Sequence, residues 1–162
     1  MDPKGKVALI TGGARIGKSV AEALARRGCD VVLTFRSSLE AAEDAAETVR
    51  RAGARAVTVQ ADLSVDGSAA AVIDETDRRF GRLDILINMA SVYRKVPFEK
   101  LDLAAWQSSL AVDLQGSYLV SLKAVPMMLR HGTGRIINFS DWVAASGRPR
   151  YKQFTPYYVW KR

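Results

Sequence analysis

The sequence predicts an α/β fold in which helices cover both faces of a parallel, doubly wound sheet. Short runs of Val, Ile and Leu alternate with longer helical stretches along the whole chain, the pattern that strand–helix–strand crossovers produce. These runs are almost continuously apolar, as expected for strands buried on both faces. With 162 residues and no linker or internal repeat, we expect one domain over residues 1–162.

Five strands are predicted, each a short apolar or β-branched run. They occupy residues 7–10, 31–35, 55–60, 83–88 and 135–139. Helical stretches rather than tight turns separate them, so the strands are joined by crossovers and lie parallel.

Four helices are predicted between the strands, over residues 16–27, 39–51, 67–80 and 102–130. Each of the first three is followed closely by a glycine, which readily adopts the left-handed conformation that ends a helix. These glycines are Gly28, Gly53 and Gly81. The fourth helix is capped by Asp102 and bent near its end by Pro126.

The C-terminal segment is predicted as a loop over residues 141–156, followed by a helix that starts at Tyr157. A single helical turn at a chain end is unstable without a cap or a packing partner. We therefore expect this chain to be a truncated piece of a longer protein, with the C-terminal strands of the sheet missing.

Composition and charge exclude several classes of protein. Hydrophobic residues make up 48% and charged residues 25%, which excludes a disordered chain. No stretch approaches the roughly 20 apolar residues that span a bilayer, and no export signal is present, so we expect a cytoplasmic protein with no membrane partner. One Cys and one His predict neither a disulfide nor a metal site.

The net charge of +7 raises the alternative of a nucleic-acid-binding module. The basic residues, however, are spread along the chain as pairs such as Arg26–Arg27 and Arg50–Arg51. Pairs at helix ends are typical of solvated faces that interact with the helix dipole. We therefore predict no nucleic-acid partner.

A glycine-rich segment, residues 11–17, connects the first strand to the first helix. Glycines at this point let the backbone approach a pyrophosphate, and the helix N-terminus supplies N–H donors. The segment predicts a Rossmann-type nucleotide site, with an ordinary strand–helix turn as the alternative. The candidate binding residues are Gly12, Arg15, Ile16 and Gly17.

The residues after the second strand predict which cofactor binds. An acidic residue there would bind the ribose 2′-hydroxyl of NAD, but this chain has Arg36 followed by Ser37. A guanidinium suits a 2′-phosphate, so NADP (NADPH) is favoured, with Arg15 as a second cation. The alternative is that both arginines are solvated surface residues.

These features and four further segments resemble the short-chain dehydrogenase/reductase family. Asp62 and Leu63 follow the third strand, where the family contacts adenine, and Asn88 and Ala90 follow the fourth strand. Asp113 lies where the family has Asn in the long helix, and residues 157–161 contain the family's Tyr-x-x-x-Lys. The resemblance implies that Asp62, Leu63, Asn88, Ala90, Tyr157 and Lys161 contact the cofactor.

The resemblance also implies catalytic roles for Tyr157, Lys161, Asp141 and Asp113. Tyr157 and Lys161 share a helix face, so Lys161 is expected to lower the phenol's pKa while Tyr157 acts as general acid. Asp141 takes the position of the family's catalytic Ser, directly after Ser140, which resembles the pteridine-reductase branch. A turn- or helix-capping Asp is the alternative.

The chain departs from the family pattern at four places. The glycine-rich loop is one residue short, and Asp113 replaces the usual Asn. The interval from Asp141 to Tyr157 is longer than usual, with the excess in residues 147–153. The family's segments after Lys161 are absent.

Two functions follow as expectations. The first is an NADPH-dependent reductase that transfers hydride to a carbonyl or C=N bond of a small, pteridine-like substrate. The resemblance implies a homo-oligomer for the full-length parent. The alternative is a catalytically inactive, nucleotide-binding fragment.

Overall fold

The computed structural model describes residues 1–12, 15–146 and 152–161. Its centre is a five-stranded sheet with the order β3-β2-β1-β4-β5, and every neighbouring pair is parallel. This confirms the predicted fold class. The strands are β1 (Val7–Thr11), β2 (Asp30–Phe35), β3 (Ala56–Gln60), β4 (Ile85–Asn88) and β5 (Arg135–Asn138).

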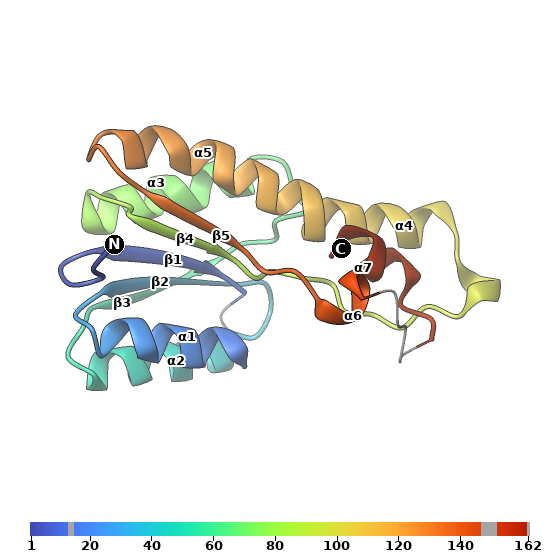
Figure 1. Ribbon diagram of the computed structural model, residues 1–162, viewed down its shortest axis with the longest axis horizontal. Helices are drawn as coiled ribbons and strands as arrows, with labels where there is room; N and C mark the ends of the chain where they lie inside the picture. The colour runs from blue at the N-terminus through green and yellow to red at the C-terminus, as the bar shows by residue number, and fades with distance from the viewer. Residues whose placement is uncertain (13–14, 147–151, 162) are drawn as a thin grey trace.

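Helices lie on both faces of this sheet. In Figure 1, α1 (Ile16–Ala25) and α2 (Leu39–Arg51) cover one face, while α3 (Ser68–Phe80) and α5 (Ser117–Leu129) cover the other. Three shorter helices lie beyond the carboxyl ends of the strands: α4 (Leu103–Ser109), α6 (Trp142–Ala145) and α7 (Thr155–Trp160). A further 3-10 turn, η1, spans Phe98–Lys100.

The core forms two layers because strand side chains alternate between the faces of the sheet. In β1, Val7 and Leu9 pack in the layer beneath α3 and α5, whereas Ala8 and Ile10 pack in the layer beneath α1 and α2. The whole of β1 is buried. Such burial stabilises the fold by about 1.5–3 kcal/mol for each large apolar side chain.

The predicted long helix is one continuous helical run with a change of pitch. Asp102 caps it, since its carboxylate accepts a hydrogen bond from the Ala105 amide at 2.7 Å. Between α4 and α5 lies a π-helical stretch, η2 (Leu110–Gly116), which the sequence did not predict. Gly116, the last residue of this stretch, packs closely against Leu63. A Cβ at Gly116 would lie only 3.0 Å from the Leu63 Cβ.

The C-terminal segment differs from its prediction as a loop. Asp141 caps the short helix α6 by accepting a hydrogen bond from the Val143 amide at 2.7 Å. Helix α7 starts at Thr155, two residues before the expected start, because Pro156 fits its first turn. Residues 147–151, which contain most of the expected insertion, lie outside the described residues.

Two other boundaries differ by two residues, and several differ by one. Helix α1 ends at Ala25 rather than at residue 27, and β4 begins at Ile85 rather than at residue 83. Among the helices that the structure describes, none combines the length and apolar character needed to cross a bilayer.

A buried charge lies at the amino end of the central strands. The side chain of Asp84 is fully buried and accepts a hydrogen bond from the Val7 amide at 2.9 Å. It also pairs with Arg82 at 2.8 Å and with Lys6 at 3.4 Å. These contacts tie the segment before β4 to the start of β1.

Candidate functional site

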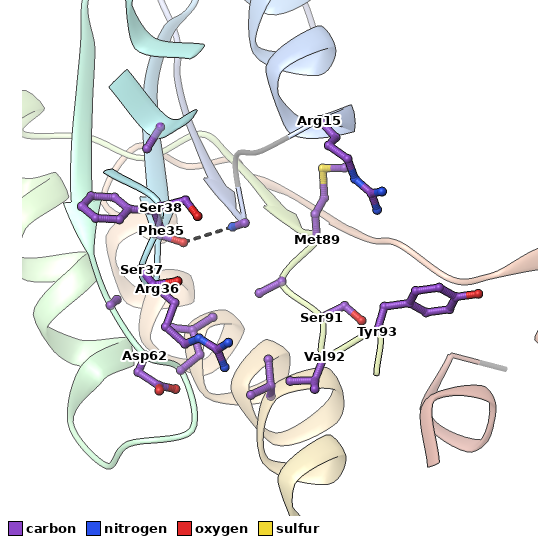
Figure 2. Close-up of a pocket in the computed structure, with 17 residues that line it drawn as sticks. Arg15, Phe35, Arg36, Ser37, Ser38, Asp62, Met89, Ser91, Val92 and Tyr93 are labelled. Atoms are coloured by element: carbon purple, nitrogen blue, oxygen red, sulfur yellow. Dashed lines mark hydrogen bonds between the residues drawn. The ribbon is translucent and has the colours of Figure 1, made fainter. Parts of the chain in front are cut away.

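A cavity of about 360 Å³ opens where the carboxyl ends of β1, β2 and β4 meet the long helix, and we call it the first cavity. The strand order changes direction at β1, which is where parallel α/β sheets bind ligands. Seven of the predicted binding residues line it: Gly12, Arg15, Arg36, Ser37, Asp62, Leu63 and Ala90. Figure 2 shows Arg36 and Asp62 at one end and Tyr93 at the other.

Gly12 is required by the backbone at the floor of the first cavity. Its φ is +76°, and a Cβ there would lie 3.0 Å from the Ala90 Cα. Its amide donates a hydrogen bond to the Thr34 hydroxyl at 3.2 Å. Because a side chain would be both strained and crowded, only glycine lets this backbone face a ligand closely.

The rest of the glycine-rich segment lies partly outside the cavity. Gly17 packs against the Gly12 backbone, since a Cβ at Gly17 would lie 2.9 Å from the Gly12 carbonyl oxygen. Ile16 is exposed to solvent. Neither of these two predicted binding residues lines the cavity. Arg15 does, with a φ of +54°. Gly13 and Ala14, where the expected one-residue shortening falls, lie outside the described residues.

Arg36 supplies a cation at the rim of the first cavity. Its carbonyl accepts a hydrogen bond from the Gln60 side chain at 3.1 Å, which fixes the backbone at the end of β2. Its guanidinium makes no ion pair within 4.0 Å of any acidic group in the described part of the chain. The site therefore presents a positive group that is available to an anion.

Asp62 lies across from Arg36 at the same end of the cavity. Its carboxylate accepts hydrogen bonds from the amide and the hydroxyl of Ser64, at 3.0 and 2.6 Å. These bonds, with a smaller contribution from the charge of Arg36, hold the pKa of Asp62 below its usual value. Asp62 is therefore an ionised, oriented acceptor.

Tyr157 and Asp141 meet outside the first cavity. The Tyr157 hydroxyl donates a hydrogen bond to the Asp141 carboxylate at 2.7 Å. Burial raises the pKa of Tyr157, and Asp141 raises it further. The phenol is thus protonated at neutral pH. The expectation that Lys161 lowers this pKa is wrong for the structure described here.

The Lys161 ammonium contacts the backbone after β5, and no hydrogen bond joins it to the Tyr157 phenol among the described residues. Its Nζ donates a hydrogen bond to the Phe139 carbonyl at 3.3 Å, and the residue is 6% exposed. Burial lowers the pKa of Lys161, while Asp113 and then Asp141 oppose that decrease. The Lys161 carbonyl accepts hydrogen bonds from the Ser140 hydroxyl (2.8 Å) and the Asp141 amide (3.0 Å), which joins α6 to α7.

Asn88 also lies outside the first cavity. It is buried, and its amide donates hydrogen bonds to the Asn138 side chain (2.8 Å) and the Ser121 hydroxyl (3.0 Å). With Asp113 and Lys161 it lines a second cavity, also of about 360 Å³. Asn88, Tyr157 and Lys161 are therefore not among the seven predicted cofactor ligands that line the first cavity.

Two residues of the site were not predicted from the sequence. The Thr11 hydroxyl accepts hydrogen bonds from the amides of Met89 and Ala90, at 3.0 and 3.1 Å, and so fixes the wall of the first cavity. Tyr93 lines that cavity, and its ring stacks on Phe154 with the ring centroids 4.3 Å apart. It meets the Tyr157 ring edge-on, with the centroids 4.7 Å apart. An aromatic residue two positions after the segment of Asn88 to Ser91 was the signal for Tyr93.

Within the described ranges, no group of three or more His, Cys, Asp or Glu side chains could hold a metal ion.

Comparisons with known proteins identify the family that the chain resembles. Residues 6–158 match the family model described as short chain dehydrogenase. The cis-4-hydroxycyclohexanecarboxylate dehydrogenase of Sinomonas cyclohexanicum is 36% identical over 152 residues, or 93% of this chain and 60% of that protein. The 3-oxoacyl-[acyl-carrier-protein] reductase FabG of Staphylococcus aureus is 35% identical over 145 residues, or 89% and 59%.

Among solved structures, a short-chain dehydrogenase/reductase from Serratia marcescens superposes with a TM-score of 0.88 and 30% identity. The match covers 99% of this chain and 64% of that one. The chain thus spans about three fifths of the length of the curated relatives it matches.

Proposed function

The chain belongs to the short-chain dehydrogenase family, and from that premise we propose that it is an NADPH-dependent oxidoreductase acting on a small carbonyl or C=N substrate. The family uses a nicotinamide cofactor, either NAD or NADP. The choice of NADPH and the substrate class belong to the proposal. The observation that carries it is Arg36, a cation at the rim of the first cavity that forms no ion pair within 4.0 Å among the described residues.

The residues of the first cavity fit such a cofactor. Gly12 leaves room for a pyrophosphate beside the Ala90 backbone, since a Cβ there would approach the Ala90 Cα to 3.0 Å. Arg36, with Ser37, would hold a 2′-phosphate, because a guanidinium binds phosphate oxygens with paired hydrogen bonds. Arg15, which lies beside Met89 across the cavity in Figure 2, is a second cation that faces the ligand. Asp62 would bind the adenine end as a hydrogen-bond acceptor.

Tyr157 is the proposed proton donor. The bound cofactor would supply a hydride to the carbon of the C=O or C=N bond. The Tyr157 hydroxyl would then give its proton to the oxygen or nitrogen of that bond. A raised pKa keeps the phenol protonated at neutral pH, and the bond to Asp141 orients it. Lys161 is proposed to support this site and to bind the ribose.

A pteridine-like substrate is the finer part of the proposal. Its support is the Asp141 carboxylate beside Tyr157, a pair suited to protonating a ring nitrogen, and the aromatic wall formed by Tyr93. Nucleotide binding without turnover is the second candidate function. Its support is that Tyr157 and Lys161 do not line the first cavity.

We also propose that residues 1–162 act as one nucleotide-binding domain, and that the whole protein is a homo-oligomer. An exposed apolar stripe on η2 and α5 supports an oligomer, since its members recur at spacings of three and four residues. They are Leu114, Tyr118, Leu122, Val125 and Leu129. Sedimentation analysis tests it, and a monomer at all concentrations would contradict it.

Turnover tests the proposed activity. NADPH oxidation is followed with a panel of ketones and a dihydropteridine, for the wild-type chain and for Tyr157→Phe. We expect the variant to lose about 100-fold or more in kcat, the usual contribution of a general acid, while its NADPH affinity is retained. Binding without oxidation of NADPH by any substrate would support the second candidate instead.

A further inference from the structure

Three basic side chains line one cavity beside the chain between β4 and α4, and we call it the basic cavity. They are Arg94, Lys95 and Lys100, and the cavity has a volume of about 350 Å³. None of the three forms an ion pair within 4.0 Å with an acidic group in the described part of the chain. Asp102 also lies in the lining, but its carboxylate already accepts a hydrogen bond from the Ala105 amide. The lining therefore has a net positive charge.

This cluster differs from the other basic residues of the chain. Most arginines elsewhere in the described ranges pair with a carboxylate, as Arg130 does with Asp77. Glu99, next to Lys100 on η1, is exposed, and it does not form an ion pair with the cluster in the part that the structure describes. An anion that entered the basic cavity would interact favourably with three cations at once. The arrangement indicates a site for an anionic group.

The basic cavity lies beside the proposed proton donor. Arg94 and Val96 also line a small neighbouring cavity whose wall includes Tyr157. The Val96 amide donates a hydrogen bond to the Gln153 carbonyl at 2.7 Å, which ties this segment to the chain before α7. Tyr93, the residue before Arg94, contacts the Tyr157 ring edge-on. Figure 1 shows α4 and α7 at the same end of the molecule, so an anion in the basic cavity would be close to the reaction site.

We propose that the substrate carries an oxyanion, either a carboxylate or a phosphate, and that the three cations of the basic cavity bind it. The carbonyl or C=N bond of the same molecule would then lie at Tyr157. The inference rests on the proposed function and adds the charge class of its substrate. Arg94 suits both oxyanions, because a guanidinium donates paired hydrogen bonds to their oxygens. A volume of about 350 Å³ is typical of small-molecule sites, which favours a small substrate over the acidic surface of a macromolecule.

The first experiment measures anion binding without cofactor. Propionate and inorganic phosphate are titrated separately into the isotope-labelled chain, with chloride at equal ionic strength as the control for screening. We expect saturable shifts of the amide NMR signals of Val96, Lys100 and Ala105, which line the basic cavity. Arg94→Gln should weaken this binding about tenfold, the lower end of what a charge-assisted contact contributes.

Arg27→Gln is the matched control. Arg27 is also exposed and has no ion pair among the described residues, but it lies at the amino end of the sheet, where the next carbonyl accepts the Gly5 amide. This variant should bind both anions as the wild-type chain does. Shifts no larger than those with chloride, or equal weakening in the two variants, would overturn the inference. So would shifts caused only by polyglutamate, which would indicate an acidic macromolecule as the ligand.

The second experiment compares substrates in NADPH-dependent turnover. Methyl ketones are used in which chains of increasing length separate the ketone from a carboxylate, a phosphate monoester or a neutral ester. At the best length, we expect kcat/KM for an anionic ketone to exceed that for its neutral counterpart about tenfold or more. This excess should be lost in Arg94→Gln and Lys100→Gln and kept in Arg27→Gln. Equal values for anionic and neutral ketones at every length would overturn the inference.

Failure of the proposed function would give a different result. It would abolish NADPH binding and the turnover of every ketone, the neutral ones included. The anion titration requires no cofactor, so it would still show whether the basic cavity binds an oxyanion.

Discussion

The Tyr157 hydroxyl donates a hydrogen bond to the Asp141 carboxylate across 2.7 Å, and the other oxygen of that carboxylate caps α6. The sequence offered two interpretations of Asp141, a helix cap and a partner of Tyr157, and this one carboxylate makes both contacts. Because the cap fixes the carboxylate, it also fixes the direction in which the phenol points. A helix cap and a candidate proton-transfer partner are combined in one residue.

Replacing Asp141 by Asn tests the electrostatic part of this pair. Asn keeps an oxygen that can cap α6 and contact the phenol, but it removes the negative charge that raises the pKa of Tyr157. We expect the pKa of Tyr157 to fall. We still expect kcat to fall about tenfold or more, because Asn can neither take up nor return a proton beside the phenol. The measurement is an alkaline titration of the Tyr157 Cζ NMR shift, assigned with Tyr157→Phe. An unchanged or higher phenol pKa would rule out Asp141 as its cause.

Replacing Arg36 by Ala tests the basis of the proposed NADPH preference. The guanidinium is a candidate partner of the 2′-phosphate, and a charge-assisted hydrogen-bonded contact of this kind contributes about 1.5–3 kcal/mol. We expect the Kd for NADPH to rise roughly 10- to 100-fold, while the Kd for NADH stays within a factor of two or so. Arg27→Ala, at an exposed position with no ion pair among the described residues, is the charge-matched control. Equal losses of affinity for NADPH and NADH would mean that Arg36 does not bind the 2′-phosphate.

Replacing Gly12 by Ala tests the close approach at the floor of the first cavity. Gly12 and Gly53 both have positive φ, but a Cβ at Gly12 would meet the Ala90 backbone at 3.0 Å, whereas nothing lies within 4 Å at Gly53. Both Ala variants should be destabilised by backbone strain, by about 1 kcal/mol. Only Gly12→Ala should also weaken nucleotide binding, which a titration of each folded variant measures. Retained affinity in Gly12→Ala would contradict the geometry proposed for the cavity.

Asp84 predicts how stability depends on pH. Burial alone would raise the pKa of Asp84, but the bonds from Arg82 and the Val7 amide hold it below its usual value. A carboxyl with a lowered folded-state pKa stabilises the fold above its unfolded pKa of about 3.9, and this contribution is lost as pH falls through the folded value. We expect Asp84→Asn to lower the free energy of unfolding by about 2 kcal/mol at neutral pH.

The difference between wild type and Asp84→Asn should shrink as the pH falls below about 4. Urea unfolding over a pH series measures this, with the exposed Asp74→Asn as control. A difference between wild type and Asp84→Asn that is constant across the acid range would contradict the ionised pair.

The sequence predicted the elements whose own residues determine them. Helix α2 occupies the predicted 39–51, because its Ala- and Glu-rich sequence favours a helix and Gly53 follows it. The buried strands were found because apolar, β-branched runs have few alternatives in a doubly covered sheet. Seven predicted ligands line the first cavity because they follow the carboxyl ends of strands or fall in the turns there.

The predictions that differ from the structure concern features that side-chain direction or tertiary packing determines. The spacing of Tyr157 and Lys161 fixes a shared helix face, but it does not fix where each polar atom points. The phenol turns to Asp141 and the ammonium to the Phe139 carbonyl, so the expected effect of Lys161 on the phenol is absent. Gly116, at the end of the π-helical stretch, packs closely against Leu63, a contact that no local sequence pattern reveals.

A fluorescence titration of the chain with NADPH, and separately with NADH, tests whether the chain binds NADPH in preference to NADH. Energy transfer from tryptophan to the reduced nicotinamide reports binding, and Trp106 and Trp160 pack together at the end of the molecule that carries Tyr157. We expect saturable binding of both cofactors, with NADPH bound at least tenfold more tightly. Tighter binding of NADH, or no binding of either cofactor, would contradict it.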